Sequence, residues 1–167
     1  IKLLVDALIQ LGAKIEYIEK EGYPPLRIFG SALTGGTIEL PGNVSSQYIS
    51  ALMMIAPEVR NGLQIQLTGK IISKPYIEMT LQLMDLFGVR GYWKNNTITI
   101  PQGTYKPIKM AVESDWSAAS YWYEMVALKP GSEITLTGLH KNSTQGDSAV
   151  AKIFESLGVK TQHTAKG

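Results

Sequence analysis

The sequence predicts an α/β protein built from a repeated strand–helix–strand–helix–strand–strand (βαβαββ) unit. Three segments share one pattern: apolar residues at helical spacing, then a glycine, then a strand-like run. Glycine suits a left-handed helix C-terminus. A second pattern, an alternating apolar–polar run ending in Thr-Gly, occurs twice after an apolar helical stretch. The unit spacing is about 70 residues, too long for a common solenoid repeat. The helix–glycine–strand segments are residues 3–17, 76–93 and 149–163, and the alternating runs are residues 63–69 and 133–138.

One complete unit is predicted between residues 36 and 100. Asn95 and Asn96 suit a hairpin turn between its last two strands. In order, the unit comprises a strand at 36–40, a helix at 46–56, a strand at 63–69, a helix at 74–87, and strands at 89–93 and 97–100.

The tail of another unit precedes this one, and most of a third follows it. The tail is a helix over residues 3–11 and a strand over 14–17. Residues 104–109, which contain Pro107, form the predicted linker. We therefore expect two parts, residues 1–105 and 106–167. The third unit is predicted as helix 117–128, strand 133–138, helix 149–157 and strand 160–163.

Composition excludes several classes of function. A net charge of +2, from 16 basic and 14 acidic residues, is too weak to indicate binding to nucleic acid or to an anionic membrane. Cysteine is absent, which excludes disulfides and thiolate chemistry. No apolar run approaches the roughly 20 residues that span a bilayer. Ile1 is not a methionine and lies within a helical pattern, so we expect an internal piece of a longer protein.

Two predicted helices begin in short polar segments rich in hydroxyl groups. Ser45 and Ser46 precede one helix, and Ser73, Lys74 and Pro75 open the other. Free N–H groups and the helix dipole make such a place an anion site, and Pro75 fits a first helical turn. Each serine taken alone is more often an ordinary N-cap. Two such starts in one unit, however, can converge on a single ligand.

Other candidate residues carry weaker signals. His140 and His163 lie far apart with no carboxylate at metal-ligand spacing, so we expect no metal site. The aromatic cluster Trp116, Tyr121, Trp122 and Tyr123 is at helical spacing and is predicted to be core. Walker, dinucleotide-binding and nucleophile-elbow motifs are absent.

Four segments carry a resemblance to a known family. The Ser45-Ser46-Gln47 segment resembles a signature of the 5-enolpyruvylshikimate-3-phosphate (EPSP) synthases, and Ser73-Lys74-Pro75-Tyr76 resembles a second. Residues 23–26 and 142–147 look like two more, and all four occur in family order across essentially the whole chain.

The resemblance implies a fold, an activity and a site. The family fold has two lobes, each an inside-out α/β barrel of three βαβαββ units, here truncated. The family transfers the enolpyruvyl group of phosphoenolpyruvate to the 5-hydroxyl of shikimate 3-phosphate in aromatic amino-acid and chorismate biosynthesis. It needs no cofactor, is the target of glyphosate, and is expected to be a cytoplasmic monomer without nucleic-acid or membrane partners.

Positions that match the family's signatures give the site residues that the resemblance implies. Ser45, Ser46 and Ser73 match positions that contact shikimate 3-phosphate. Gln47 matches a residue between shikimate 3-phosphate and phosphoenolpyruvate, and Tyr76 matches an aromatic residue beside the shikimate ring. Residues 1–105 are then most of the shikimate-binding lobe, and residues 106–167 are the crossing and the first unit of the other lobe.

Departures from the family pattern limit what the chain is expected to do. The family's N-terminal Lys-Ser pair is absent, its phosphoenolpyruvate-binding arginines and acid–base residues would lie beyond Gly167, and Trp116 stands where a small residue is expected. We therefore assign no catalytic residue and expect no turnover by the chain alone. Two alternatives stay open: a stand-alone binding module of the same fold, and the sibling family that transfers enolpyruvyl to UDP-N-acetylglucosamine.

Overall fold

The computed structural model describes residues 1–164 and divides the chain into two compact units. The first unit is Ile1–Ile108 and the second begins at Lys109. This boundary falls inside the segment predicted as a linker. Each unit has its own buried apolar cluster.

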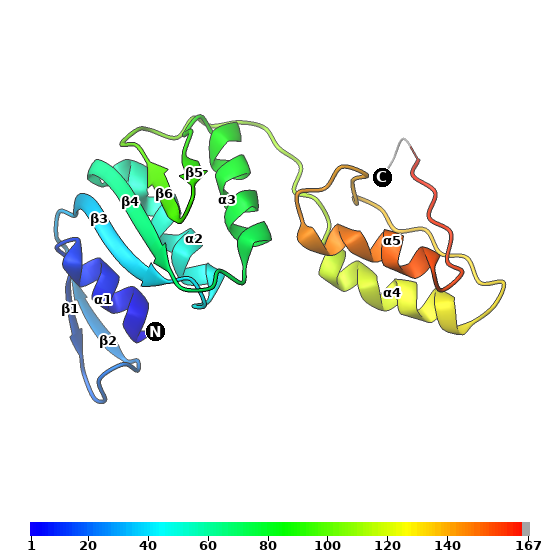
Figure 1. Ribbon diagram of the computed structural model, residues 1–167, viewed down its shortest axis with the longest axis horizontal. Coiled ribbons are helices and arrows are strands. Elements are labelled where there is room, and N and C mark those ends of the chain that lie inside the picture. Colours follow the sequence, from blue (N-terminus) through cyan, green and yellow to red (C-terminus); the bar gives the residue numbers. More distant parts are fainter. Residues whose placement is uncertain (165–167) are drawn as a thin grey trace. The chain divides into compact units, whose positions relative to one another are not determined.

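The first unit contains a four-stranded mixed sheet whose helices follow its strands in the predicted order (Figure 1). Strand order is β3-β4-β6-β5, with β3 and β4 parallel and the other pairs antiparallel. The predicted βαβαββ unit is thereby confirmed, including the Asn95-Asn96 turn, where Lys94 pairs with Thr97. Its elements are β3 (Thr34–Pro41), α2 (Ser46–Ile55), a 3₁₀ turn (Ala56–Glu58), β4 (Arg60–Thr68), α3 (Lys74–Leu86), β5 (Tyr92–Lys94) and β6 (Thr97–Ile100).

A helix and a small hairpin precede the sheet. Helix α1 (Lys2–Gln10) and strand β1 (Lys14–Tyr17) match their predictions. Strand β2 (Leu26–Phe29), which pairs antiparallel with β1, was not predicted. It is short and largely exposed, so no clear alternation of apolar and polar residues marks it in the sequence.

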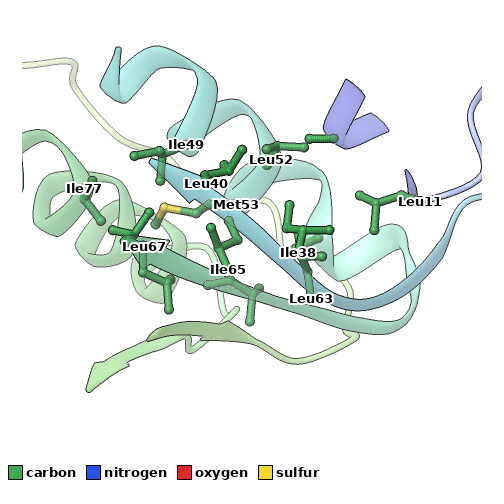
Figure 2. Close-up of a cluster of buried hydrophobic side chains, with 14 of the residues drawn as sticks. Leu11, Ile38, Leu40, Ile49, Leu52, Met53, Leu63, Ile65, Leu67 and Ile77 are labelled. Carbon is green, nitrogen blue, oxygen red and sulfur yellow. The ribbon is translucent and has the colours of Figure 1, made fainter. Parts of the chain in front are cut away.

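One face of the sheet and the inner faces of α2 and α3 form the core of the first unit. Figure 2 shows sheet residues such as Ile65 and Leu67 directed toward Ile49 and Met53 of α2 and Ile77 of α3. The opposite sheet face carries polar residues, as in the hydrogen bond between Thr37 and Gln64. Burial on one face fixes the register of the strands.

The second unit is helical, which corrects two predicted strands. It contains α4 (Trp116–Leu128), a 3₁₀ turn (Gly146–Ala149) and α5 (Val150–Glu155). Residues 133–138 and 160–163 were predicted as strands, but neither forms a strand in the described chain. A strand needs a hydrogen-bonded neighbour, and none pairs with them among residues 109–164.

The aromatic residues of α4 divide between the core and the surface. Trp116 and Tyr123 are buried, and Tyr123 also meets Phe154 of α5 edge-on with ring centroids 5.6 Å apart. Tyr121 and Trp122 are exposed, so the prediction that the whole cluster is core was wrong for these two. Residues seven apart return to the same helix face, whereas 121 and 122 point elsewhere.

Candidate anion site at two helix starts

Two strand-to-helix junctions meet at one edge of the first unit's sheet. Strands β3 and β4 are parallel neighbours, with Pro41 opposite Thr68 near their carboxyl ends. Helix α2 begins just after β3, and α3 begins just after β4. The carboxyl ends of parallel strands are the usual place for ligands in open α/β sheets. The fold therefore places the starts of α2 and α3 next to each other.

Backbone hydrogen bonds tie the two junctions together at Gly42. Its N–H donates to the Thr68 carbonyl oxygen at 2.6 Å, and its own carbonyl accepts from the Ile72 N–H at 3.3 Å. A Cβ at position 42 would lie 2.8 Å from Ile71 Cγ1 and 3.1 Å from the Thr68 oxygen. This close approach of the two segments requires a glycine.

The start of α2 is only weakly capped. Ser45 is the N-cap, and its Oγ accepts from the Gln47 N–H at 3.4 Å, well beyond the usual 2.9–3.0 Å. Ser46 is half-buried, Gln47 is exposed, and the first turn holds no acidic residue. Backbone N–H groups at the positive end of the helix dipole are therefore available to an anion.

The start of α3 has no side-chain cap at all. Ser73 is its N-cap residue, and within the described chain its hydroxyl makes no hydrogen bond. Pro75 lies in the first turn, as predicted, and no acidic residue is there. The Lys74 ammonium adds positive charge beside Ser73 and lies 5.9 Å from the centre of the Trp93 ring. The Tyr76 side chain is 49% exposed.

The structure thus brings the five predicted site residues to two adjacent helix starts. Ser45, Ser46 and Gln47 come from one junction, and Ser73 and Tyr76 from the other. Their geometry suits an anion because unused donors are present and acidic side chains are absent from both first turns. That they contact shikimate 3-phosphate, and that Gln47 contacts phosphoenolpyruvate, stays a prediction.

Helix α4 of the second unit shows the opposite arrangement at its start. Asp115 Oδ1 accepts from the N–H groups of Ser117 at 2.7 Å and Ala118 at 3.2 Å. Gln145 Oε1 accepts from the Trp116 N–H at 2.9 Å. The chain's own side chains satisfy these donors, and Asp147, hydrogen-bonded to the Ser117 hydroxyl, adds further negative charge. This helix start is closed to an anion.

Glu113 organises the same region and was missed by reasoning from the sequence. Its carboxylate accepts from Trp116 Nε1 and the His140 N–H, both at 2.9 Å, and from Ser143 Oγ at 2.7 Å. Burial raises the pKa of Glu113, but these hydrogen bonds, with a contribution from Gln145, together hold it below its ordinary value of 4.5. The 142–147 signature was the available signal, since Ser143 and Gln145 belong to it.

A groove of about 650 Å³ also lies in the second unit, and none of the five predicted site residues lines it. It is lined by Trp116, Tyr123 and Val126 of α4 and by residues from both unpaired segments, 133–138 and 160–163. We interpret it as space between α4 and these segments.

Among residues 1–164, no group of three or more His, Cys, Asp or Glu side chains is arranged to hold a metal ion. None of the described helices is long and apolar enough to cross a membrane.

Fold and site together define an α/β protein in which two adjacent helix starts form a candidate anion site. The family model described as EPSP synthase (3-phosphoshikimate 1-carboxyvinyltransferase) matches residues 1–167. The chain belongs to the EPSP synthase family.

Curated relatives agree with this assignment, and a solved structure shares the fold. A 3-phosphoshikimate 1-carboxyvinyltransferase of Bacteroides fragilis is 55% identical over 100% of this chain and 41% of its own length. The enzyme of the same name from Sulfurovum sp. is 43% identical over 95% of this chain and 38% of its own length. An EPSP synthase structure from Acinetobacter baumannii shares the fold, with a TM-score of 0.73 at 22% identity, over 94% of this chain and 34% of that one. The chain spans about two fifths of the length of such curated relatives.

Proposed function

We propose that this chain supplies the shikimate 3-phosphate-binding edge of an enzyme that transfers the enolpyruvyl group of phosphoenolpyruvate to the 5-hydroxyl of shikimate 3-phosphate. The observation that carries the proposal is the pairing of two open helix starts, α2 and α3, at one sheet edge. Family membership and the names of the relatives support the substrate class. Cytoplasmic location and a monomeric state follow from the family resemblance and belong to the same proposal.

The proposed roles follow from donor chemistry. The hydroxyl groups of Ser45, Ser46 and Ser73 donate to the phosphate oxygens, and the dipoles of both helices favour its negative charge. Gln47 and Tyr76 lie at the rim, where Gln47 faces both substrates and Tyr76 covers the shikimate ring. The relatives' names favour this enzyme over the UDP-N-acetylglucosamine sibling. A stand-alone binding module would share the site and differ only in lacking turnover.

Ligand titration of the isotope-labelled chain, followed by amide chemical shifts, tests the proposal. Hydrogen bonds to a charged group contribute about 1.5–3 kcal/mol each, and after the cost of association two or three leave an affinity near millimolar. We expect shikimate 3-phosphate to shift the amides of Ser45, Ser46, Gln47 and Ser73. Shikimate, which lacks the phosphate, should bind more weakly.

Serine substitutions sharpen this test. Ser46→Ala and Ser73→Ala should each weaken shikimate 3-phosphate binding by about tenfold or more, because each loses a charge-assisted hydrogen bond. Ser31→Ala is the matched control, since Ser31 is exposed and precedes β3, at the opposite end of that strand. Shifts confined to other regions, or equal binding by all three variants, would show that the site is assigned wrongly.

A further inference from the structure

A chain of hydroxyl groups connects α2 to α3 below the candidate site. The oxygens of Ser50 and Thr80 lie 2.8 Å apart, and Thr80 Oγ1 lies 2.8 Å from the Tyr76 carbonyl oxygen, to which it donates. A threonine hydroxyl has one hydrogen. Because Thr80 uses it for Tyr76, Ser50 must be the donor to Thr80. The direction of the chain is therefore from Ser50 of α2, through Thr80, to the Tyr76 backbone of α3.

This contact differs in kind from the rest of the α2–α3 interface. Among residues 1–164 it is the only side-chain hydrogen bond between the two helices, and Thr80 is the only buried polar residue, at 8% exposure. The remaining contact surface includes apolar side chains such as Ile49, Met53 and Ile77. Apolar burial is non-directional and tolerates sliding, whereas a hydrogen bond fixes distance and angle. The hydroxyl chain therefore sets the register of one helix against the other.

The hydroxyl chain lies close to the starts of both helices, where the candidate site is. Ser50 lies one helical turn after Ser46, and Thr80 lies one turn after Tyr76. Residues four apart share a helix face, so the hydroxyl chain lies directly below both helix starts. The Gly42 hydrogen bonds tie together the segments that precede the two helices.

We propose that Ser50 and Thr80 are positioning residues of the phosphate site. They do not touch the ligand; they hold Ser46 and Ser73 at the separation at which both hydroxyl groups reach one phosphate. Binding constellations need placement within about 0.5 Å, which side chains locked by supporting hydrogen bonds provide. This inference rests on the proposed function, because it assumes that one phosphate is held by both helices.

The test compares the affinities of the chain for shikimate 3-phosphate and for shikimate. Thr80→Val and Ser50→Ala should each lower the affinity for shikimate 3-phosphate about three- to tenfold and that for shikimate much less. Applying both changes should add little to either one, because both break the same connection. Thr80→Ser keeps the hydroxyl and should therefore retain most of the preference for shikimate 3-phosphate over shikimate. Ile98→Val, a core truncation on β6, is the control for stability loss alone.

The ratio of the affinity for shikimate 3-phosphate to that for shikimate distinguishes a positioning role from a purely structural one. A change that only lowers the folded fraction weakens both ligands equally, as expected for Ile98→Val. An unchanged ratio in Thr80→Val and Ser50→Ala overturns this inference while leaving the proposed function intact. Failure of the unsubstituted chain to bind shikimate 3-phosphate overturns both. Should Thr80→Val not fold, Ser50→Ala carries the same prediction, since Ser50 is only half-buried.

Discussion

Replacing Gly42 by alanine tests whether the close approach of the two junctions makes the site. The new Cβ would lie 2.8 Å from Ile71 Cγ1, 3.1 Å from the Thr68 oxygen and 3.2 Å from Ile71 Cα. The second and third of these contacts involve backbone atoms, so a side-chain rotation alone does not relieve the overlap. Overpacking of this kind typically destabilises by about 1–3 kcal/mol. The segments must separate, so shikimate 3-phosphate binding should weaken together with stability.

Urea unfolding followed by the amide signals of Ile65 and Ile98 reports the stability of the first unit alone. Gly103→Ala is the matched control, because its Cβ would meet its nearest neighbour, Val89 Cγ2, at an ordinary 4.0 Å. A glycine-to-alanine change without strain is expected to be neutral or to stabilise by up to about 1 kcal/mol. If Gly42→Ala proved as stable as Gly103→Ala and bound ligand equally well, the reasoning about the two junctions would be wrong.

The second unit yields two further predictions. Because hydrogen bonds lower the pKa of Glu113, its stabilising contribution is complete above its ordinary value of 4.5 and is lost as the pH falls through the lowered value. In Glu113→Gln, the acid unfolding of α4, followed by circular dichroism, should therefore no longer show this pH-dependent loss of stability. A pH profile identical to that of the unsubstituted chain would contradict the prediction. Asp115→Ala removes the cap of α4 and should destabilise that helix by about 0.5–2 kcal/mol, with faster amide exchange at Ser117 and Ala118. Asp115→Asn, which keeps a capping oxygen, should lose much less.

Sequence patterns predicted the first unit well because its elements find their partners inside it. The alternation of residues 63–69 indicates one buried face, and β3 and β6 supply neighbours on both sides of β4. The serines before α2 and α3 were recognisable as caps from local sequence. That the two helix starts lie next to each other is a tertiary property, which follows only from the parallel pairing of β3 with β4.

Elsewhere the same kind of pattern gave wrong or incomplete results. Residues 133–138 alternate as clearly as 63–69, yet they form no strand because no neighbouring strand pairs with them in the described chain. Alternation reports which face a segment can bury, not whether a hydrogen-bonding partner is present. The Glu113 cluster was missed for a related reason: its members, from residue 113 to residue 145, are brought together only by the packing of a loop onto α4.

The contrast between α2 and α4 gives an independent reason to place the anion in the first unit. Both helices follow polar segments, and both N-caps hydrogen-bond to their own first turn. At α4 a carboxylate makes those bonds at 2.7 and 3.2 Å, so the dipole is already matched by a negative charge and a phosphate would be repelled. At α2 a neutral serine makes one bond of 3.4 Å, so an arriving phosphate replaces a weak contact with charge-assisted ones. The two helix starts thus differ in their N-cap residue, and this difference favours the start of α2 over that of α4 as the place for an anion.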